Sequence, residues 1–244
     1  FNSLTKWIYK HSRKVLIQSN GFREYIQNQG VPSNKIIFYP NPTEGFYKPL
    51  KKVKEYQEFF QNRFFNIVFA GNIGEAQSFK TIIDAINNIK ELPIRVTVLG
   101  DGRYKETALS LIKEKGLESR FNFIGSYPPT EMPKFFSHSD ALLVSLKKSK
   151  IFSLTIPAKI QSYLACGKPI IASIDGSGAK IVADAKCGLV SPAEDSLILS
   201  ENIKKLMNLD KHSVQEMGVN GRKYYEKKLD REYLLKKLEF IFDS

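Results

Sequence analysis

Residues 65–90 read FNIVFAGNIGEAQSFKTIIDAINNIK, and the order of features within them decides the fold. An apolar run over Asn66–Ala70 has the length of a strand, and a turn containing two glycines follows it. The next residues carry apolar side chains at helical spacing, which predicts a helix over Phe79–Lys90 with Ser78 as its N-cap. The strand is apolar throughout instead of alternating, as burial on both faces requires. This stretch therefore predicts one strand–turn–helix unit of an α/β protein.

The same unit recurs along the chain, and the repetition predicts the architecture. Strands alternating with helices in this way form a parallel sheet covered by helices on both faces, which is a Rossmann-like α/β fold. The predicted strands are Val15–Gln18, Lys35–Tyr39, Asn66–Ala70, Arg95–Leu99, Asn122–Ile124, Ala141–Ser145, Pro169–Ser173 and Gly188–Val190. The predicted helices are Phe22–Gln29, Phe79–Lys90, Arg103–Lys115, Thr130–Ser137, Ala158–Ala165, Ala179–Ala185, Leu197–Leu206, Val214–Lys228 and Arg231–Phe242.

The composition is that of a globular protein. Of 244 residues, 42% are hydrophobic and 12% aromatic, which is enough to build a full core. The sequence has no run of ~18 apolar residues that would span a membrane. Cys166 and Cys187 form no CxxC pair, and the three histidines lack the spacing of metal ligands. We therefore predict free thiols and no metal site.

The net charge of +12 is the unusual feature of the composition. Three explanations remain open: attraction to anionic substrates, attraction to an anionic membrane surface, and basic residues spread over solvated helix faces. The chain has no Arg-rich arm and no motif of interleaved basic and aromatic residues, so nucleic-acid binding is not favoured.

Three predicted strands end in glycine-containing loops. These are Gly71-Asn72-Ile73-Gly74, Gly100-Asp101-Gly102 and Gly125-Ser126-Tyr127. The carboxyl ends of parallel strands lie at one edge of the sheet, where open α/β sheets bind their ligands, and backbone N–H groups at the following helix favour phosphate. Each loop alone is also typical of an ordinary strand-to-helix turn, and G-x-x-G is a weak motif. Three such loops at one edge favour a nucleotide site.

A fourth segment adds a cation at the same edge. Residues 154–169 read LTIPAKIQSYLACGKP, in which Pro157 is suited to the start of a helix and Gly167 to its end. The free backbone N–H groups around Ile156 could meet an anion there, with Lys159 as a point charge. The alternative is that Lys159 is a surface lysine.

Taken in order, these segments resemble the C-terminal domain of family 4 glycosyltransferases of the GT-B fold. The likeness is carried by VFAGNIGEAQSFKTIIDAI, VTVLGDGRYKE, FNFIGSYPPTEMPKFFSHSDALLVSL and IFSLTIPAKIQSYLACGKPIIASIDGSGAKIVADAKCGLVSPAED, and it runs from about Val15 to the C-terminus. Within the family it is similar to bacterial enzymes of surface-polysaccharide assembly, capsule or lipopolysaccharide, that transfer N-acetylated amino sugars such as N-acetylfucosamine.

The resemblance implies a set of donor-binding residues. Residues 71–74 would lie against the diphosphate and sugar, the second and third loops would face the nucleobase and ribose, residues 155–159 would cover the diphosphate, and Ser162 would lie near the ribose. The implied residues are Gly71, Asn72, Ile73, Gly74, Gly100, Asp101, Gly102, Ser126, Tyr127, Thr155, Ile156, Lys159 and Ser162.

Two departures from the family pattern concern the diphosphate and ribose contacts. Many members place an Arg and a Lys after the first glycine, where this chain has Asn72 and, approximately, Gln77. Many also have two Glu residues, the second of which binds ribose, where this chain has Leu154 and Ser162. Lys159 and helix N-termini would have to compensate for these losses.

The resemblance also implies a division of the chain. Residues 1–42 would be the end of an N-terminal acceptor domain and the crossover from it, 43–62 a linker, 63–228 the nucleotide-sugar domain, and 229–244 a helix crossing back. The first residues, FNSLTKW, read like the middle of a longer protein. The expected partners are a UDP-sugar and an N-terminal domain outside this chain. The acceptor-side base would lie in that domain, so this chain alone is expected to be inactive.

The resulting hypothesis is a retaining glycosyltransferase that needs no metal or other cofactor, because no DxD pair is present and helix N-termini with a lysine could stabilise the leaving diphosphate. We expect it in the cytoplasm, with peripheral membrane association as an option for a lipid-linked acceptor. The alternatives are a GT-B nucleotide-sugar epimerase, which would need acid–base side chains at the cleft, and a non-catalytic nucleotide-binding module. A dehydrogenase is disfavoured because no complete GxGxxG follows a strand.

Overall fold

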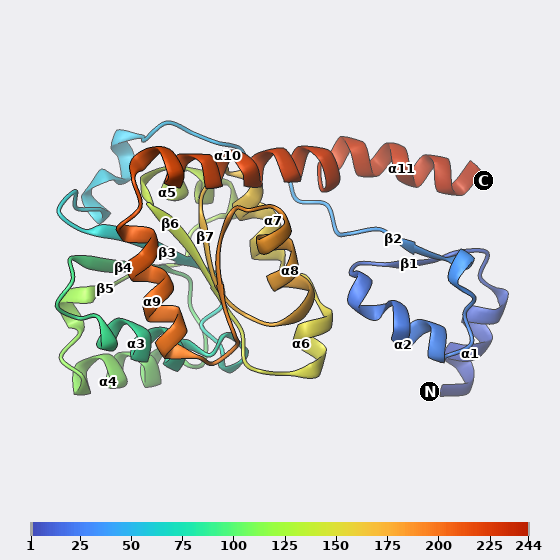
Figure 1. Cartoon of the computed structure of the whole chain (residues 1–244), viewed down its shortest axis with the longest axis horizontal. Helices are drawn as coiled ribbons and strands as arrows, with labels where there is room; N and C mark the ends of the chain where they lie inside the picture. The colour runs from blue at the N-terminus through green and yellow to red at the C-terminus, as the bar shows by residue number, and fades with distance from the viewer. Residues whose placement is uncertain (1, 244) are drawn as a thin grey trace.

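The computed structural model describes residues 2–243 and shows the predicted α/β fold (Figure 1). Six parallel strands form the main sheet in the order β5-β4-β3-β6-β7-β8. The chain order reverses between β3 and β6, and this switch point is where such sheets bind ligands. The strands are β3 (Phe65–Ala70), β4 (Ile94–Leu99), β5 (Phe121–Gly125), β6 (Ala141–Ser145), β7 (Ile170–Ser173) and β8 (Gly188–Ser191).

Helices cover both faces of the sheet, as the uniformly apolar strands predict. In β3, Ile67 and Phe69 enter the core on one face, and Val68 and Ala70 enter the core on the other. The first core is closed by α3 (Phe79–Asn88), α4 (Lys105–Glu114) and α9 (Ser196–Met207). The second is closed by α5 (Met132–His138), α7 (Ala158–Ala165), α8 (Gly176–Asp184) and α10 (Lys211–Lys228).

A small unit built from the first forty residues lies beside the main domain (Figure 1). It contains α1 (Asn2–His11), β1 (Val15–Ile17), α2 (Arg23–Asn28) and β2 (Ile36–Phe38), and its two strands pair in parallel around a core of four apolar residues. The last helix, α11 (Arg231–Asp243), extends from α10 over this unit, and Lys237 Nζ donates a hydrogen bond to the Phe38 carbonyl at 2.8 Å. Phe1, which opens the stretch that we interpret as the middle of a longer protein, lies outside the described residues.

Short 3-10 turns connect several of these elements: η1 (Asn20–Phe22), η2 (Ser33–Lys35), η3 (Lys54–Phe59), η4 (Glu75–Gln77), η5 (Glu118–Arg120) and η6 (Pro129–Glu131). The η3 turn lies in the segment predicted as a linker. Its Tyr56 ring stacks on Phe135 of α5 with 4.0 Å between centroids, so this segment packs on the main domain. The boundaries between the predicted parts of the chain stay predictions.

One local prediction is wrong, and one short helix was missed. Ser78 does not cap α3 with its side chain: its backbone is left-handed, with φ 44°, and its hydroxyl lies 2.8 Å from that of Thr81. The cause is the η4 turn, which ends on Ser78 and sets its backbone before the helix begins. A five-residue helix, α6 (Lys150–Leu154), was not predicted, because so short a segment shows no helical periodicity.

The main sheet opens at its switch point. Strands β3 and β6 pair only at Ile67 with Ala141 and Val68 with Leu142. Beyond these pairs the hydroxyl of Tyr163, from α7, accepts a hydrogen bond from Ala70 N at 3.3 Å and donates one to the Leu143 carbonyl at 3.4 Å. A side chain thus replaces ladder bonds where the two strands separate.

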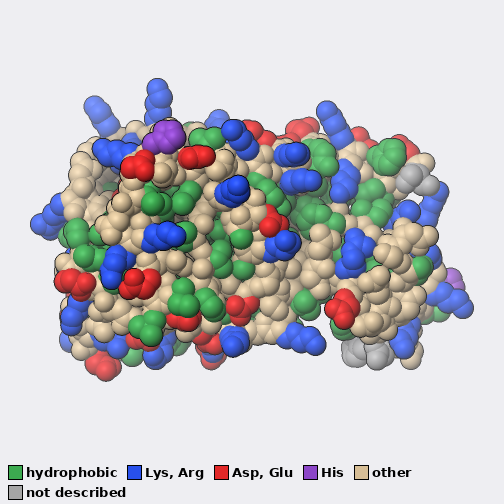
Figure 2. All heavy atoms as spheres, in the orientation of Figure 1, with side chains coloured by type: hydrophobic (Ala, Val, Ile, Leu, Met, Phe, Trp, Pro, Cys, Tyr) green, Lys and Arg blue, Asp and Glu red, His purple; other side chains and the backbone are tan. Residues whose placement is uncertain are grey.

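The surface view shows how charged side chains are distributed on one face of the molecule. On the face in Figure 2, Lys and Arg side chains are scattered among acidic and apolar ones, as on solvated helix faces. Within residues 2–243 no helix is both long and apolar enough to cross a membrane.

Candidate functional site

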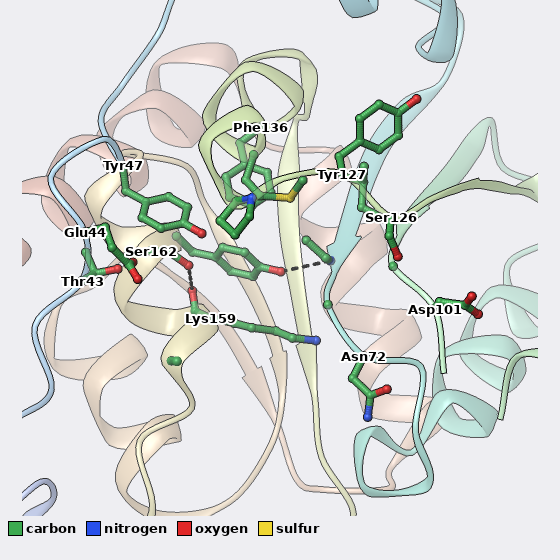
Figure 3. Close-up of a pocket in the computed structure, with 18 residues that line it drawn as sticks. Thr43, Glu44, Tyr47, Asn72, Asp101, Ser126, Tyr127, Phe136, Lys159 and Ser162 are labelled. Carbon is green, nitrogen blue, oxygen red and sulfur yellow. Dashed lines mark hydrogen bonds between the residues drawn. The ribbon is translucent and has the colours of Figure 1, made fainter. Parts of the chain in front are cut away.

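A cleft of about 540 Å³ opens at the carboxyl ends of β3, β4 and β5 (Figure 3). One wall consists of the glycine loops that follow these strands, and the facing wall is the first part of α7. Residues 43–47, between β2 and the main domain, close a third side. The lining residues are Thr43, Glu44, Tyr47, Ala70, Gly71, Asn72, Leu99, Gly100, Asp101, Ser126, Tyr127, Pro129, Met132, Phe136, Ala158, Lys159, Ser162 and Tyr163.

The structure brings all four predicted segments to this cleft, although not every predicted residue lines it. Eight of them do: Gly71, Asn72, Gly100, Asp101, Ser126, Tyr127, Lys159 and Ser162. The other five, Ile73, Gly74, Gly102, Thr155 and Ile156, are not among the lining residues. Ile73 and Ile156 are buried in the two cores. The Gly74 amide donates to Gln77 Oε1 at 3.1 Å, and the Thr155 hydroxyl donates to the Phe152 carbonyl at 2.9 Å.

Close approach to the backbone of the first loop explains the glycines of the second loop. Gly100 has φ +138°, and a Cβ there would lie 2.0 Å from the Gly71 carbonyl oxygen. A Cβ on Gly102 would lie 2.4 Å from the Ile73 carbonyl oxygen, so this glycine serves loop-to-loop packing instead of the cleft. The first two loops therefore pack directly against each other where they line the cleft.

Lys159 is the single basic side chain among the cleft-lining residues, and its environment is unusual. It lies in the first turn of α7 and extends across the cleft toward the first glycine loop (Figure 3). Its Nζ is buried, has no hydrogen-bond partner among residues 2–243, and lies 3.7 Å from the centroid of the Phe69 ring. Loss of hydration lowers the pKa of this ammonium from 10.5 to about 7. An unpaired buried ammonium is costly, and an anionic ligand in the cleft would supply the missing partner.

The third wall contains residues that no motif in the sequence marked. Thr43, Glu44 and Tyr47 come from the segment predicted as a linker and lie across from Ser162 of α7 (Figure 3). Burial, followed by the charge of Glu44, raises the pKa of Tyr47 to about 12, so its hydroxyl stays protonated. Tyr163 and Phe136 also line the cleft. The sequence did not mark them as site residues, because apolar side chains at helical spacing predict only burial in the core.

An aromatic cluster supports the end of the cleft near the third glycine loop. Tyr127 packs edge-on against Phe135 with 4.6 Å between centroids, and Phe135 in turn stacks on Tyr56. The Tyr56 hydroxyl donates to Glu131 at 2.6 Å, and this bond is the main reason that the pKa of Tyr56 is raised to about 12. Tyr127 is thereby held as a fixed apolar surface beside the exposed Ser126.

The departures from the family pattern have clear structural outcomes. Asn72 lines the cleft, whereas Gln77 binds Gly74 and is absent from the lining. Ser162 lines the cleft, and its hydroxyl donates to the Lys159 carbonyl at 3.0 Å, whereas Leu154 lies outside it. Glu75, which could have repelled a phosphate, forms an ion pair with Lys147 outside the cleft.

The cleft is thus lined by a buried cation, glycine-loop backbone and an aromatic surface. Such a site suits a ligand with an anionic group at its centre and uncharged rings attached. Among residues 2–243 no three His, Cys, Asp or Glu side chains are grouped as metal ligands.

Comparison with known proteins gives one family and several relatives. Residues 51–224 match the family model described as glycosyl transferases group 1. WcaI of Escherichia coli K12, a glycosyl transferase provisionally assigned to colanic acid biosynthesis, is 24% identical over 225 residues, which cover 88% of this chain and 53% of WcaI. WcaL of the same strain, with a similar provisional assignment, is 21% identical over 90% of this chain and 53% of its own length. This chain therefore spans about half the length of these relatives.

Solved structures show the same architecture. The crystal structure of HepE from Anabaena in complex with UDP superposes with a TM-score of 0.85 at 16% sequence identity, covering 97% of this chain and 65% of HepE. At this identity the similarity concerns the fold, and structural neighbours of this kind are GT-B glycosyltransferases.

Proposed function

Because the chain belongs to the group 1 glycosyl transferases, we propose that its cleft binds the UDP-sugar donor of a transferase that builds a surface polysaccharide. The observation that carries the proposal is the Lys159 ammonium, which is buried at the cleft with no hydrogen-bond partner among residues 2–243. The relatives provisionally assigned to colanic acid biosynthesis support the polysaccharide product, and the UDP bound to HepE supports the nucleotide.

In this proposal the diphosphate lies between Lys159 and the first glycine loop. Transfer of the sugar leaves a UDP diphosphate, and the cation in a water-poor cleft stabilises the charge that develops on it. Amides of that loop and the N-terminus of α7 add partial positive charge. These groups stabilise the leaving group without a metal. The uracil lies toward Ser126 and the apolar surface of Tyr127.

The sugar and the acceptor are the finer parts of the proposal. We propose an N-acetylated amino sugar, transferred with retention of configuration to a polysaccharide or lipid-linked acceptor. The base or acceptor-binding groups would come from an N-terminal domain, so the 244-residue chain binds the donor without transferring it. The protein would work in the cytoplasm or at the inner face of the membrane, where lipid-linked acceptors are located.

The test is isothermal titration calorimetry of the 244-residue chain with UDP, ADP and GDP, followed by UDP-N-acetylglucosamine and UDP-glucose. We expect UDP to bind more tightly than ADP or GDP, and the N-acetylated donor to bind more tightly than UDP-glucose. Absence of UDP binding at millimolar concentration would remove the donor-site proposal. Equal affinity for the two donors would contradict the amino-sugar proposal alone.

The same samples separate the alternatives. Release of UDP only after a polysaccharide or lipid-linked acceptor is added supports a transferase, and interconversion of the donor to its epimer supports an epimerase. Donor binding with neither reaction, even when an N-terminal domain is present, would support a non-catalytic binding module.

A further inference from the structure

The cleft contains two acidic side chains, and only one of them is free. Asp101 accepts a hydrogen bond from the Gly102 amide at 2.9 Å and lies 3.6 Å from Lys105 Nζ. The Glu44 carboxylate lines the same cleft, is exposed to solvent, and has no hydrogen bond and no ion pair among residues 2–243. The cleft therefore has one unpaired cation, Lys159, and one unpaired carboxylate, Glu44.

The two unpaired charges occupy different positions along the cleft. Lys159 points toward the loop at Gly71, whereas Glu44 lies on the third side of the cleft, near Ser162 (Figure 3). A nucleoside diphosphate has a matching polarity, since its diphosphate is anionic and its ribose presents two neighbouring hydroxyl donors. A carboxylate repels the first group and accepts hydrogen bonds from the second. This polarity would orient the nucleotide in one direction.

The neighbours of Glu44 are suited to a sugar ring. The hydroxyl of Ser162 donates to the Lys159 carbonyl, which leaves its oxygen free to accept. The Tyr47 hydroxyl points into the cleft beside them and stays protonated as a donor (Figure 3). Thr43 is buried directly before Glu44, and the Tyr47 amide donates to the Glu44 carbonyl at 3.1 Å, so this turn holds a defined backbone.

We infer that Glu44, from the segment that enters the main domain, accepts hydrogen bonds from the ribose hydroxyls of the bound nucleotide, opposite Ser162. The inference rests on the proposed function, because it requires a nucleoside diphosphate in the cleft. Glu44 precedes the glycine loops in the sequence and belongs to none of the strand–turn–helix units that carry them. Glu44 would thereby give the site its selectivity for a ribonucleotide.

The experiment compares UDP with 2′,3′-dideoxy-UDP, which keeps the uracil and the diphosphate and lacks both hydroxyls. Calorimetry is performed on the unchanged chain, on Glu44→Ala, and on Glu58→Ala as a matched control. Glu58 is an exposed glutamate of the η3 turn and does not line the cleft. The unchanged chain and the control should bind UDP about tenfold more tightly than the dideoxy analogue, since a charged hydrogen bond contributes at least this much.

For Glu44→Ala we expect a loss of about tenfold in UDP affinity and no loss for the dideoxy analogue, so the preference disappears. If the unchanged chain binds UDP and Glu44→Ala keeps the full preference for it, the inference is overturned while the proposed function stands. Equal binding of both nucleotides by the unchanged chain overturns it as well. If the unchanged chain binds neither nucleotide, the proposed function itself fails.

Discussion

A Cβ atom placed on Gly71 would lie 2.8 Å from Lys159 Cε and 3.2 Å from its Nζ. The side chain of Lys159, in the first turn of α7, thus packs directly on the backbone of Gly71, in the loop after β3. Gly71 also has φ +121°, a conformation that other residues rarely adopt. The position of the buried ammonium therefore depends on glycine at residue 71.

Gly71→Ala should abolish UDP binding. The new methyl group would push Lys159 away from the loop, and the left-handed backbone would cost on the order of 1–3 kcal/mol of stability. Calorimetry gives the binding and thermal unfolding gives the stability. Gly30→Ala is the matched control, because Gly30 has φ +91° but open space around it. The control should lose comparable stability and keep its UDP affinity, and equal loss of binding in both variants would contradict the role of the contact.

Lys159→Met should change stability and binding in opposite directions. Removing an unpaired buried charge should raise the free energy of unfolding at pH 7 by on the order of 1 kcal/mol. UDP affinity should fall about 10-fold to 100-fold, because a hydrogen bond to a charged group is lost. Denaturant unfolding and calorimetry measure the two effects. Lys113→Met, at an exposed position of α4, should leave UDP affinity unchanged. A variant that is destabilised and still binds UDP would contradict this account.

Donor affinity should fall as the pH rises above about 7. The pKa of Lys159 is lowered to about 7, so the lysine is charged below this value and must take up a proton to bind a diphosphate above it. UDP-N-acetylglucosamine is the suitable ligand, because its diphosphate is fully ionised across this range. Titrations from pH 6 to pH 9 should show nearly constant affinity at the acidic end of this range and a progressive loss above about pH 7.

Lys159→Arg is the control for this pH dependence, because arginine stays charged throughout the range. Its donor affinity should be flat from pH 6 to pH 9. Lys168 also has a pKa lowered by burial, to about 8, but its Nζ donates to the Ser137 and Ser139 carbonyls away from the cleft. Any contribution from Lys168 would persist in the arginine variant. A flat profile in the unchanged chain would contradict the proton uptake.

The sequence predicts the elements best where local chemistry marks both of their ends. Helix α7 has its predicted bounds, Ala158–Ala165, because Pro157 precedes it and Gly167, with φ +64°, follows it. The parallel sheet was predicted because its strands are apolar runs without alternation, as burial on both faces requires. The flanking proline and glycine and the apolar strand residues all lie within or next to the element that they predict.

The walls of the cleft were predictable only in part, since part of the site depends on contacts distant in sequence. The glycine loops could be placed at one sheet edge because each follows the carboxyl end of a predicted parallel strand, which located Gly71 and Gly100. Glu44 and Tyr47 reach the cleft only because the chain passes over α7 before it enters the main domain, and no local pattern encodes that path. The side-chain bridge made by Tyr163 between β3 and β6 depends likewise on tertiary packing.

Gly218→Ala should destabilise the fold without affecting the cleft. Helix α10 packs on the end of α7, and a Cβ on Gly218 would lie 2.2 Å from the Gly167 carbonyl oxygen, a backbone atom that cannot rotate away. Such overpacking costs about 1–3 kcal/mol. Denaturant unfolding should show this loss, whereas Glu216→Ala, at an exposed position of the same helix, should change stability little. Calorimetry at a temperature where the variant stays folded should give the UDP affinity of the unchanged chain. Unaltered stability would mean that α10 can shift along α7, and the close contact between the two glycines would then not be what positions this helix.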